Sequence, residues 1–427
     1  MPIPALIKIF SVFILILVLN RLRIHLSLCL FWGSLVLGLW MGLGPVDLLQ
    51  SAIISTTRLQ TISLALIVGL IMVMSQIMEE SGHMERLVKS LARLSKDARK
   101  VGAVMSALIG LLPMPGGALF SAPIVETSLS NHTIKGEQKT ALNYWFRHIW
   151  EYWWPLYPGV ILAVALLEVE TWHYMVMMAP MTLVSTIAGV VFILKSIVKV
   201  EDQHMGDLSW PKVREFIWEM MPILIVIFMI VVMAGLVSFL GFVGFSTKIP
   251  AALSILPGLL ASIIWVCLVN HIPFRQFRSA VVVKRILPML LLIMAIMVFK
   301  GIMGDSQAVV HVRNELMAYK IPIMLIILIM PFLSGIITGI AIGFVGTSFP
   351  LIIPLFQTPH LLDYLSIAAL AYTFGFMGMM LSPVHLCFLV TKDYFKVSLL
   401  NSYQYIIKPI LTVTIVAVVL FSIIRAF

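Results

Sequence analysis

The chain has 427 residues, of which 61% are hydrophobic and only 11% are charged. Soluble domains carry about 25% charged residues, so this composition excludes an ordinary soluble protein and predicts one embedded in a lipid bilayer. The net charge of +10 does not indicate a nucleic-acid partner, because lysine and arginine gather in the loops on one face of a membrane protein. The cysteines, Cys29, Cys267 and Cys387, lie in apolar stretches and have no metal-ligand or disulfide spacing, so we predict small packing residues and no metal site.

Ten apolar stretches are long enough to cross a membrane, which takes about 20 residues. The predicted spans lie near 4–20, 24–44, 61–79, 141–166, 172–194, 216–240, 250–269, 286–303, 363–390 and 403–424. Arg21 and Arg23 follow the first stretch, which has no small-residue cleavage site. We therefore expect a retained helix and not a removed signal peptide.

Two further apolar stretches, 101–129 and 321–356, are interrupted midway by helix-breaking residues. The first interruption is the run 113–117, with two prolines and two glycines, and the second is 343–348. Each half is too short to cross alone, so we predict two re-entrant hairpins. Broken backbone at that depth must be buried in protein or line a wet cavity.

Loop charge supports this layout. With 82–100 in the cytoplasm, the loops on the cytoplasmic face hold twenty Lys and Arg residues, against four on the other face. The four are Arg58, Lys248, Arg313 and Lys320. This bias follows the positive-inside rule. It predicts a multi-pass protein of a prokaryotic cytoplasmic membrane with both termini outside.

The chain also contains an internal duplication. The segment 71–81 reappears at 296–306 with six of eleven residues identical. Pro155 matches Pro383 further along. Each half has five spans and one hairpin, and because five is odd the second half must be inserted upside down. We therefore predict an all-α protein of two inverted repeats, 1–200 and 216–427, joined by a cytoplasmic linker at 201–215; such repeats typically build transporters around one central site.

The interruptions of the two hairpins are the first candidate site. Unwound backbone frees N–H groups for an anion and carbonyls or hydroxyls for a cation such as Na⁺. A simple kink in a packed helix is the alternative, but the feature occurs in both halves. The candidate substrate-binding residues here are Pro115, Gly116, Gly117, Ser121, Gly343, Gly346, Thr347 and Ser348.

The span that follows each hairpin is the second candidate site, because both spans contain prolines and polar residues that predict discontinuous helices. In 141–166 the break is expected near Pro155 and Pro158, and four tryptophans there either wall a cavity or form an interfacial belt. Arg147 and Glu151, four residues apart, are predicted to share a helical face and pair. The candidate substrate ligands are Asn143, Arg147, Thr373 and Ser382, and the candidate carriers of a coupling proton or ion are His148, Glu151 and His385. A structural ion pair and a packing histidine are the alternatives.

The segments 112–123, 143–158 and 339–350 resemble an uncharacterised prokaryotic membrane-protein family of the ion transporter superfamily, which is related to gluconate permeases, citrate carriers and dicarboxylate–sodium symporters. The resemblance covers nearly the whole chain. It implies inverted repeats with re-entrant hairpins, a homodimer, and transport of small organic anions driven by Na⁺ or H⁺. The hairpin tips lack the Ser-Asn-Thr of the dicarboxylate–sodium symporters, so those symporters' site residues do not carry over.

The sequence thus predicts a secondary active transporter that moves a small, organic anion by alternating access, coupled to Na⁺ or H⁺. Apart from Na⁺ as a possible coupling ion, no cofactor is expected. An intramembrane enzyme acting on lipid or peptide is one alternative, but no HExxH, GxGD or GxSxG motif occurs. An anion channel is the other, and hairpins that enter from opposite sides argue against a continuous pore.

Overall fold

A computed structural model describes residues 3–92, 98–111, 117–129, 134–197, 209–243, 254–273, 275, 277–278, 283–356 and 358–426, and all regular elements in them are helical. The first half contains α1 (Ala5–Arg21), α2 (Leu26–Met41), α3 (Pro45–Thr57), α4 (Leu59–Glu80), α5 (His83–Ala92), α6 (Ala98–Ile109), α7 (Ala118–Ser128), α8 (Gly136–Arg147), α9 (Pro158–Leu167), α10 (Thr171–Phe192) and the 3-10 helix η1 (Leu194–Ser196). The second half contains α11 (Trp210–Glu219), α12 (Met221–Phe242), α13 (Leu256–Val269), α15 (Val283–Asp305), α16 (Ala308–Ala318), α17 (Ile323–Thr338), α18 (Ala341–Ile352), the 3-10 helix η3 (Ile353–Leu355), α19 (Leu361–Met380), α20 (Leu386–Tyr394) and α21 (Leu399–Ala426).

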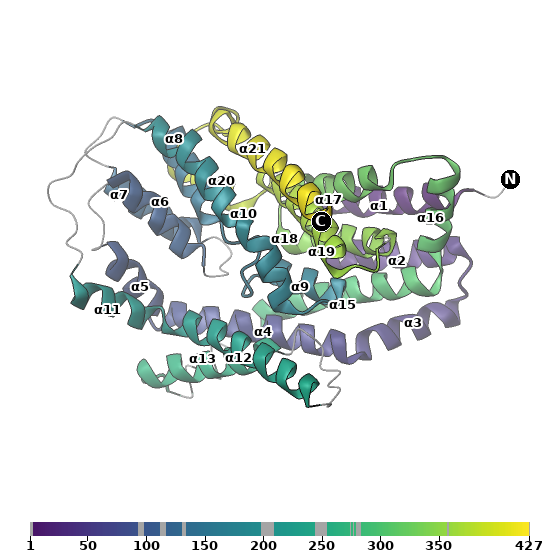
Figure 1. Cartoon of the computed structure of the whole chain (residues 1–427), viewed down its shortest axis with the longest axis horizontal. Coiled ribbons are helices and arrows are strands. Elements are labelled where there is room, and N and C mark those ends of the chain that lie inside the picture. The colour runs from purple at the N-terminus through teal and green to yellow at the C-terminus, as the bar shows by residue number, and fades with distance from the viewer. Residues whose placement is uncertain are drawn as a thin grey trace.

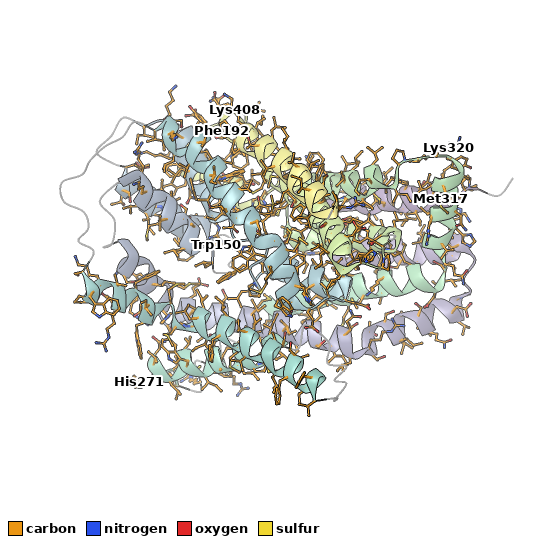
Figure 2. All side chains as sticks on the ribbon, in the orientation of Figure 1. Trp150, Phe192, His271, Met317, Lys320 and Lys408 are labelled. Atoms are coloured by element: carbon orange, nitrogen blue, oxygen red, sulfur yellow. The ribbon has the colours of Figure 1, made fainter. Side chains whose placement is uncertain are left out.

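Several of these helices have the length and composition of membrane spans. Within the described residues, six qualify: Leu59–Glu80, Thr171–Ser196, Met221–Leu240, Ile286–Asp305, Leu361–Met380 and Leu399–Ala426. α12 is the least enclosed of the six, and large apolar side chains such as Phe228 and Val231 project from it. Side chains with charged groups, such as Lys320 and Lys408, lie at the periphery (Figure 2). By length and composition, these six helices are able to cross a membrane.

The other predicted spans are shorter helices or interrupted ones. α1 and α2 have 17 and 16 residues, and α13 begins at Leu256, with the preceding predicted residues partly outside the described part. The predicted span 216–240 is divided into α11 and α12 at Met220. The sequence analysis missed α16 and α3. In α3, the signal was Pro45 at the first helical position with Asp47 accepting from the Gly44 amide at 3.0 Å, a combination typical of a helix start.

The helices from α4 onward occur in the same order in both halves. A long helix, a short one, a two-helix hairpin, an interrupted helix and a final long helix follow one another as α4 to α10 and again as α15 to α21. The first hairpin is α6 with α7, and the second is α17 with α18; within each, the two helices pack together. The interrupted helices are α8 with α9 and α19 with α20. This order agrees with the duplication found in the sequence.

The elements around the two interruptions form the middle of the molecule. α18 contacts α9, and α20 contacts α7 and α8, so each half of the chain supplies helices to the other's neighbourhood. Figure 1 shows α12 and α13 along one edge beside α4, while α1, α2 and α16 lie at the opposite end from α5 and α7. The core of buried side chains runs through the centre, where α18 is buried along its whole length.

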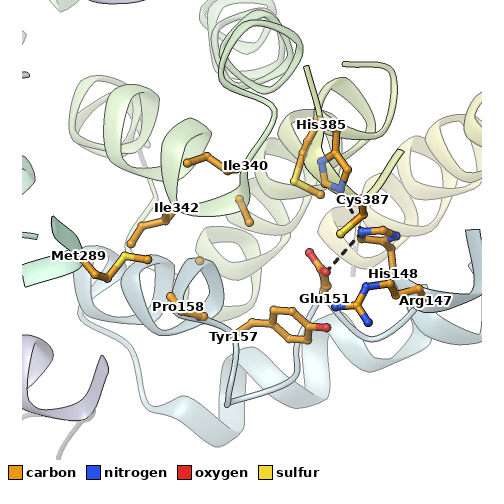
Figure 3. A pocket seen from close by; sticks show the side chains of 13 residues that line it. Arg147, His148, Glu151, Tyr157, Pro158, Met289, Ile340, Ile342, His385 and Cys387 are labelled. Atoms are coloured by element: carbon orange, nitrogen blue, oxygen red, sulfur yellow. Dashed lines mark hydrogen bonds and ion pairs between the residues drawn. The ribbon is translucent and has the colours of Figure 1, made fainter. Parts of the chain in front are cut away.

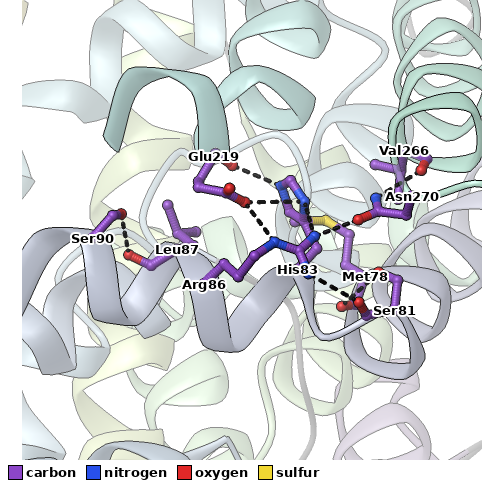
Figure 4. Close-up of polar contacts among 9 residues, drawn as sticks. All are labelled: Met78, Ser81, His83, Arg86, Leu87, Ser90, Glu219, Val266 and Asn270. Atoms are coloured by element: carbon purple, nitrogen blue, oxygen red, sulfur yellow. Dashed lines mark hydrogen bonds and ion pairs between the residues drawn. The ribbon is translucent and has the colours of Figure 1, made fainter. Parts of the chain in front are cut away.

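A cluster of polar side chains joins α5 to α11 (Figure 4), which lie at one end of the molecule in Figure 1. Nε2 of His83 donates to the Glu219 carbonyl oxygen at 2.8 Å, and its Nδ1 lies 3.2 Å from the Glu219 carboxylate. Arg86 contacts the same carboxylate at 3.5 Å and donates to the side chain of Asn270. Residues 201–208 of the predicted linker lie outside the described residues, and the rest of it leads into α11.

Candidate functional site

The break in the first interrupted helix is longer than predicted and starts earlier in the chain. α8 ends at Arg147, His148 has non-helical φ and ψ of −101° and 2°, and irregular backbone runs to Tyr157. Pro158 then opens α9 as its first residue, where the missing N–H costs no hydrogen bond. Pro155 lies within this irregular segment and Pro158 ends it, as predicted, but the helix already ends at Arg147, about two turns before Pro155, so Arg147 and Glu151 do not share a continuous helix.

Aromatic side chains hold this irregular segment in place. The indole N–H groups of Trp150 and Trp154 donate to the carbonyls of Ala107 and Leu111 at 2.9 Å each, and the hydroxyl of Tyr157 donates to the Gly110 carbonyl. These are carbonyls at the end of α6, which have no partner within the helix. Trp145 and Trp153 donate to α10 at 2.9 and 2.8 Å. The four tryptophans thus anchor the break, and none of them lines the cavity described below.

The second interruption repeats this arrangement with smaller side chains. Between α19 and α20, Ser382 donates to the Ile336 carbonyl at 2.6 Å, and Nδ1 of His385 lies 2.7 Å from the Gly339 carbonyl. Both acceptors lie at the end of α17, the first helix of the second hairpin. In both halves, therefore, the interrupted helix caps the hairpin that precedes it.

The turn of the second hairpin lies earlier than predicted. α17 ends at Thr338 and Gly339 adopts a left-handed conformation, with φ of 65°. The run 343–348 is helical and belongs to α18, so the expectation of an unwound tip there was wrong. Glycine and hydroxyl residues do not mark an unwound tip here, because a buried membrane helix also contains them where it packs closely against its neighbours. Gly346, for example, faces Ile296, whose side chain leaves no room for a Cβ atom.

Three of the four predicted hydroxyl ligands of the second half, Thr347, Ser348 and Ser382, donate hydrogen bonds to backbone carbonyls. Thr347 donates to the Gly343 carbonyl at 2.8 Å and Ser348 to the Phe344 carbonyl at 2.6 Å. Thr373 lies in α19, and its buried hydroxyl has no hydrogen-bond partner among the described residues. Their role as substrate ligands stays a prediction.

In the first hairpin, Pro115 and Gly116 lie outside the described residues, while Gly117 precedes α7. A Cβ atom on Gly117 would lie 2.5 Å from a guanidinium nitrogen of Arg147, so this glycine sits directly against that side chain. Ser121, one turn further on, makes weak bonds to carbonyls of its own helix at 3.4 Å.

Asn143 connects three elements of the site's surroundings. Its carbonyl accepts from Ser106 of α6 at 3.0 Å, and its amide donates to Thr391 of α20 at 3.1 Å and to the Ala118 carbonyl of α7 at 3.4 Å. These bonds occupy both ends of the amide, and Asn143 does not line the cavity. Its predicted role as a substrate ligand is untested, and the contacts give it a positioning role.

A cavity of about 190 Å³ lies where the two interruptions meet (Figure 3). Four predicted site residues line it: Arg147, His148, Glu151 and His385. The remaining lining comes mainly from the first residues of helices, namely Tyr157, Pro158 and Gly159 at α9, Ile340, Ala341 and Ile342 at α18, and Cys387 at α20. Gly159 allows two of these helix starts to touch, because a Cβ atom there would lie 2.6 Å from that of Ala341.

The polar side chains of the cavity contact one another across the two halves. Nε2 of His148 lies 3.0 Å from Nε2 of His385 and 3.8 Å from the Glu151 carboxylate. Arg147 is 2% exposed and near enough to Glu151 for electrostatic attraction. Two tyrosines link the halves directly: Tyr144 donates to the Met380 carbonyl at 3.1 Å and Tyr372 to the Glu151 carbonyl at 2.8 Å.

Cys387 is a polar cavity residue that was not predicted to belong to the site. Its thiol, with the ring nitrogens of His148 and His385, forms a group of three donor atoms within 4.8 Å of one another. The available signal was the His-x-Cys spacing of His385 and Cys387 at a predicted helix break. It was too short to indicate a metal site because the third donor lies 237 residues away in the chain.

Comparison with known families gives a match over almost the whole chain. The model of a family described as "Protein of unknown function (DUF401)" matches residues 3–424. The chain belongs to this family. No curated protein matches it. The match agrees with a whole-chain resemblance to an uncharacterised family, and it assigns neither the ion transporter superfamily nor an activity, so the function must be argued from the cavity.

Proposed function

We propose that this DUF401 protein is a secondary active transporter that moves a small anion, in particular an organic acid, across a prokaryotic cytoplasmic membrane by alternating access. The observation that carries the proposal is the convergence of helix N-termini and Arg147 on one buried cavity. A volume of about 190 Å³ suits a small solute better than a lipid tail or a peptide.

Anion selectivity follows from the dipoles and the charge around the cavity. α9, α18 and α20 all begin at its wall, and α7 begins at Gly117 beside the guanidinium of Arg147. The first N–H groups of a helix have no partner within it, and the helix dipole adds partial positive charge there. An arginine adds a full charge and can hold a carboxylate with two parallel hydrogen bonds. Together these groups favour an anionic solute.

Alternating access is supported by how the cavity is divided between the halves. Arg147, His148 and Glu151 come from the break after α8, while His385 and Cys387 come from the break after α19. The two hairpins and the two interrupted helices occur in matching order, and in each half the break caps its hairpin. We propose that the halves are the inverted repeats 1–200 and 216–427, with both chain termini outside. Rocking of one against the other would expose the shared site to each side in turn.

The test is transport by purified protein reconstituted in liposomes. Labelled mono-, di- and tricarboxylates, sugar acids and phosphate are supplied under an imposed Na⁺ gradient, an H⁺ gradient or neither. We expect saturable uptake of at least one organic acid that depends on one of the two gradients. No uptake of any anion would contradict the proposal, and flux that is rapid and independent of both gradients would indicate the channel.

Arg147→Gln tests the assignment of the site. Loss of a charge-assisted hydrogen bond pair costs about 1.5–3 kcal/mol, so binding of the anion should weaken about ten- to hundredfold. Lys300→Gln is the matched control, because Lys300 pairs with Glu168 at 2.8 Å and does not line the cavity. Equal effects of the two substitutions would remove Arg147 from the anion site.

A further inference from the structure

The two histidines of the cavity face each other through the same nitrogen. Nδ1 of His148 lies 2.5 Å from the Tyr144 carbonyl oxygen, and Nδ1 of His385 lies 2.7 Å from the Gly339 carbonyl oxygen. A carbonyl oxygen only accepts hydrogen bonds, so both Nδ1 atoms must carry hydrogen. In the neutral rings, each Nε2 then carries a lone pair, and these two atoms are 3.0 Å apart.

Two lone pairs at this separation repel each other unless a positive centre lies between them. A proton would satisfy the two nitrogens without drawing in Cys387 or Glu151. A metal ion would also use the thiol of Cys387, whose donor atom lies within 4.8 Å of both nitrogens, and the carboxylate of Glu151, which is 3.8 Å from Nε2 of His148. His148, His385 and Cys387 supply three donors, and Glu151 lies within reach of the first as a fourth; two nitrogens, one sulfur and one oxygen are the number and kind of ligands that a tetrahedral zinc site uses.

The two histidine nitrogens require little movement to bind such an ion. Zinc–nitrogen distances of about 2.0–2.1 Å at a tetrahedral angle place two ligating nitrogens about 3.3 Å apart, a few tenths of an ångström beyond their present separation. The carbonyl partners of both Nδ1 atoms match the outer contacts that orient metal-binding histidines. Imidazole and thiolate donors favour Zn²⁺ and similar transition metals over Na⁺, Mg²⁺ or Ca²⁺.

We propose that His148, His385, Cys387 and Glu151 bind one Zn²⁺-class transition-metal ion. The Cys387 thiol loses its proton to solvent as the metal–sulfur bond forms, and both imidazoles bind as neutral rings. Thiolate and carboxylate neutralise the two charges of the ion. Two ligands come from each interrupted helix, so the ion joins the two halves at the cavity. The metal site goes beyond the proposed transport and does not depend on it.

Metal binding is measured on the untagged, full-length protein in detergent after chelator treatment. Titration with Co²⁺ should give one bound ion per chain, tetrahedral d–d bands and a near-ultraviolet charge-transfer band from a cobalt–thiolate bond. X-ray absorption of the Zn²⁺ form should show a sulfur ligand beside nitrogen and oxygen. Absence of binding at micromolar metal, or a bound ion without a sulfur ligand, would overturn the proposal.

Cys387→Ser and His385→Gln test the assigned ligands, with Cys267→Ser as the matched control on α13. The first two should weaken Zn²⁺ binding more than about a hundredfold, beyond the ten- to hundredfold effect of losing an outer contact, and Cys387→Ser should also abolish the charge-transfer band. The control should change neither. Retention of the band in Cys387→Ser would place the ion elsewhere. The wild-type spectra decide the question even if a variant fails to fold, and transport plays no part in either readout.

Discussion

Two buried histidine–glutamate clusters in this molecule differ in how their polar atoms are satisfied. At the edge, both ring nitrogens of His83 have partners, one in the Glu219 carbonyl and the other in the Glu219 carboxylate and Arg86. In the centre, His148 and His385 each have one nitrogen bound to a carbonyl, and their other nitrogens face each other. Both nitrogens of the edge histidine therefore contact other polar groups, whereas the two central histidines each direct one nitrogen at the other.

This difference separates a structural role from a functional one. A buried polar group whose bonds are all made within the protein contributes to stability and specificity. Donor atoms that converge without forming hydrogen bonds with one another indicate a candidate ligand-binding site. Residue type alone does not distinguish the clusters, since both contain a histidine, a glutamate and an arginine.

The largest contrast between the two regions should appear at their glycines. A Cβ atom on Gly110 would lie 1.9 Å from the backbone oxygen of Arg147, whereas Gly82, before α5, has only a terminal nitrogen of Arg86 at 3.7 Å. Gly110→Ala must push α6 away from the break, so we expect little folded protein by size-exclusion chromatography. Gly82→Ala meets only the strain of its positive φ, about 1–2 kcal/mol. Equal thermal stability of the two variants would contradict this expectation, because it would show that the backbone around Gly110 and Arg147 can shift to accept a Cβ atom.

The comparison also explains which features the sequence could predict. The hydrophobic stretches located most of the long helices, and prolines with polar residues marked both interrupted helices, because these properties are local. Arg147, His148, Glu151 and His385 were named from the cost of placing such groups in a membrane, and all four line the cavity.

Features that depend on contacts between distant segments could not be predicted. The break at Arg147 is fixed by indole bonds to α6, not by Pro155, and nothing local reveals them. The helical state of Gly343 and Ser348 follows from burial between elements of both halves. Cys387 gains its partners in the same way. The local sequence therefore predicted which polar residues belong to the site, whereas the position at which the backbone unwinds depends on tertiary packing.

Tryptophans offer the next contrast between centre and edge. Trp154 donates to the buried Leu111 carbonyl at 2.9 Å, while Trp218 is 52% exposed and stacks edge-on against Trp265 near His83. Trp154→Phe leaves a buried carbonyl without its donor, so unfolding free energy should fall by about 1–3 kcal/mol. Trp218→Phe should change it by less than about 0.5 kcal/mol. Chemical denaturation in detergent measures both, and a greater loss in Trp218→Phe would contradict the anchoring role of the indole.

The two glutamates should separate stability from binding. Glu219→Gln removes the charge that faces His83 and Arg86, so the protein should lose about 1 kcal/mol of stability and keep its metal affinity. Glu151→Gln removes a proposed ligand from the centre. It should weaken Zn²⁺ binding about tenfold, equivalent to about 1.4 kcal/mol, without lowering the melting temperature of the metal-free protein. Calorimetric titration and thermal melting of both variants measure the contrast, and a loss of metal affinity in Glu219→Gln alone would reverse the assignment.

The smallest expected effect concerns the pH dependence of the edge cluster. Burial lowers the pKa of His83 below its ordinary value of 6.5, while burial raises the pKa of Glu219 above its ordinary 4.5. The unfolded chain therefore protonates His83 more readily than the folded chain does, and this histidine's contribution to stability is lost as pH falls below 6.5. Protonation of Glu219 in the folded state acts in the opposite direction, because it removes a buried charge.

His83→Gln removes the first effect and leaves the second. The melting temperature of wild-type protein should fall more steeply than that of the variant as pH is lowered from above 6.5 toward the lower pKa of the folded state. His25→Gln, at an exposed position before α2, is the control and should follow the wild type. If the melting temperature of His83→Gln also follows that of the wild type, burial does not keep His83 neutral. The contrast drawn between His83 and the His148–His385 pair would then lose its support.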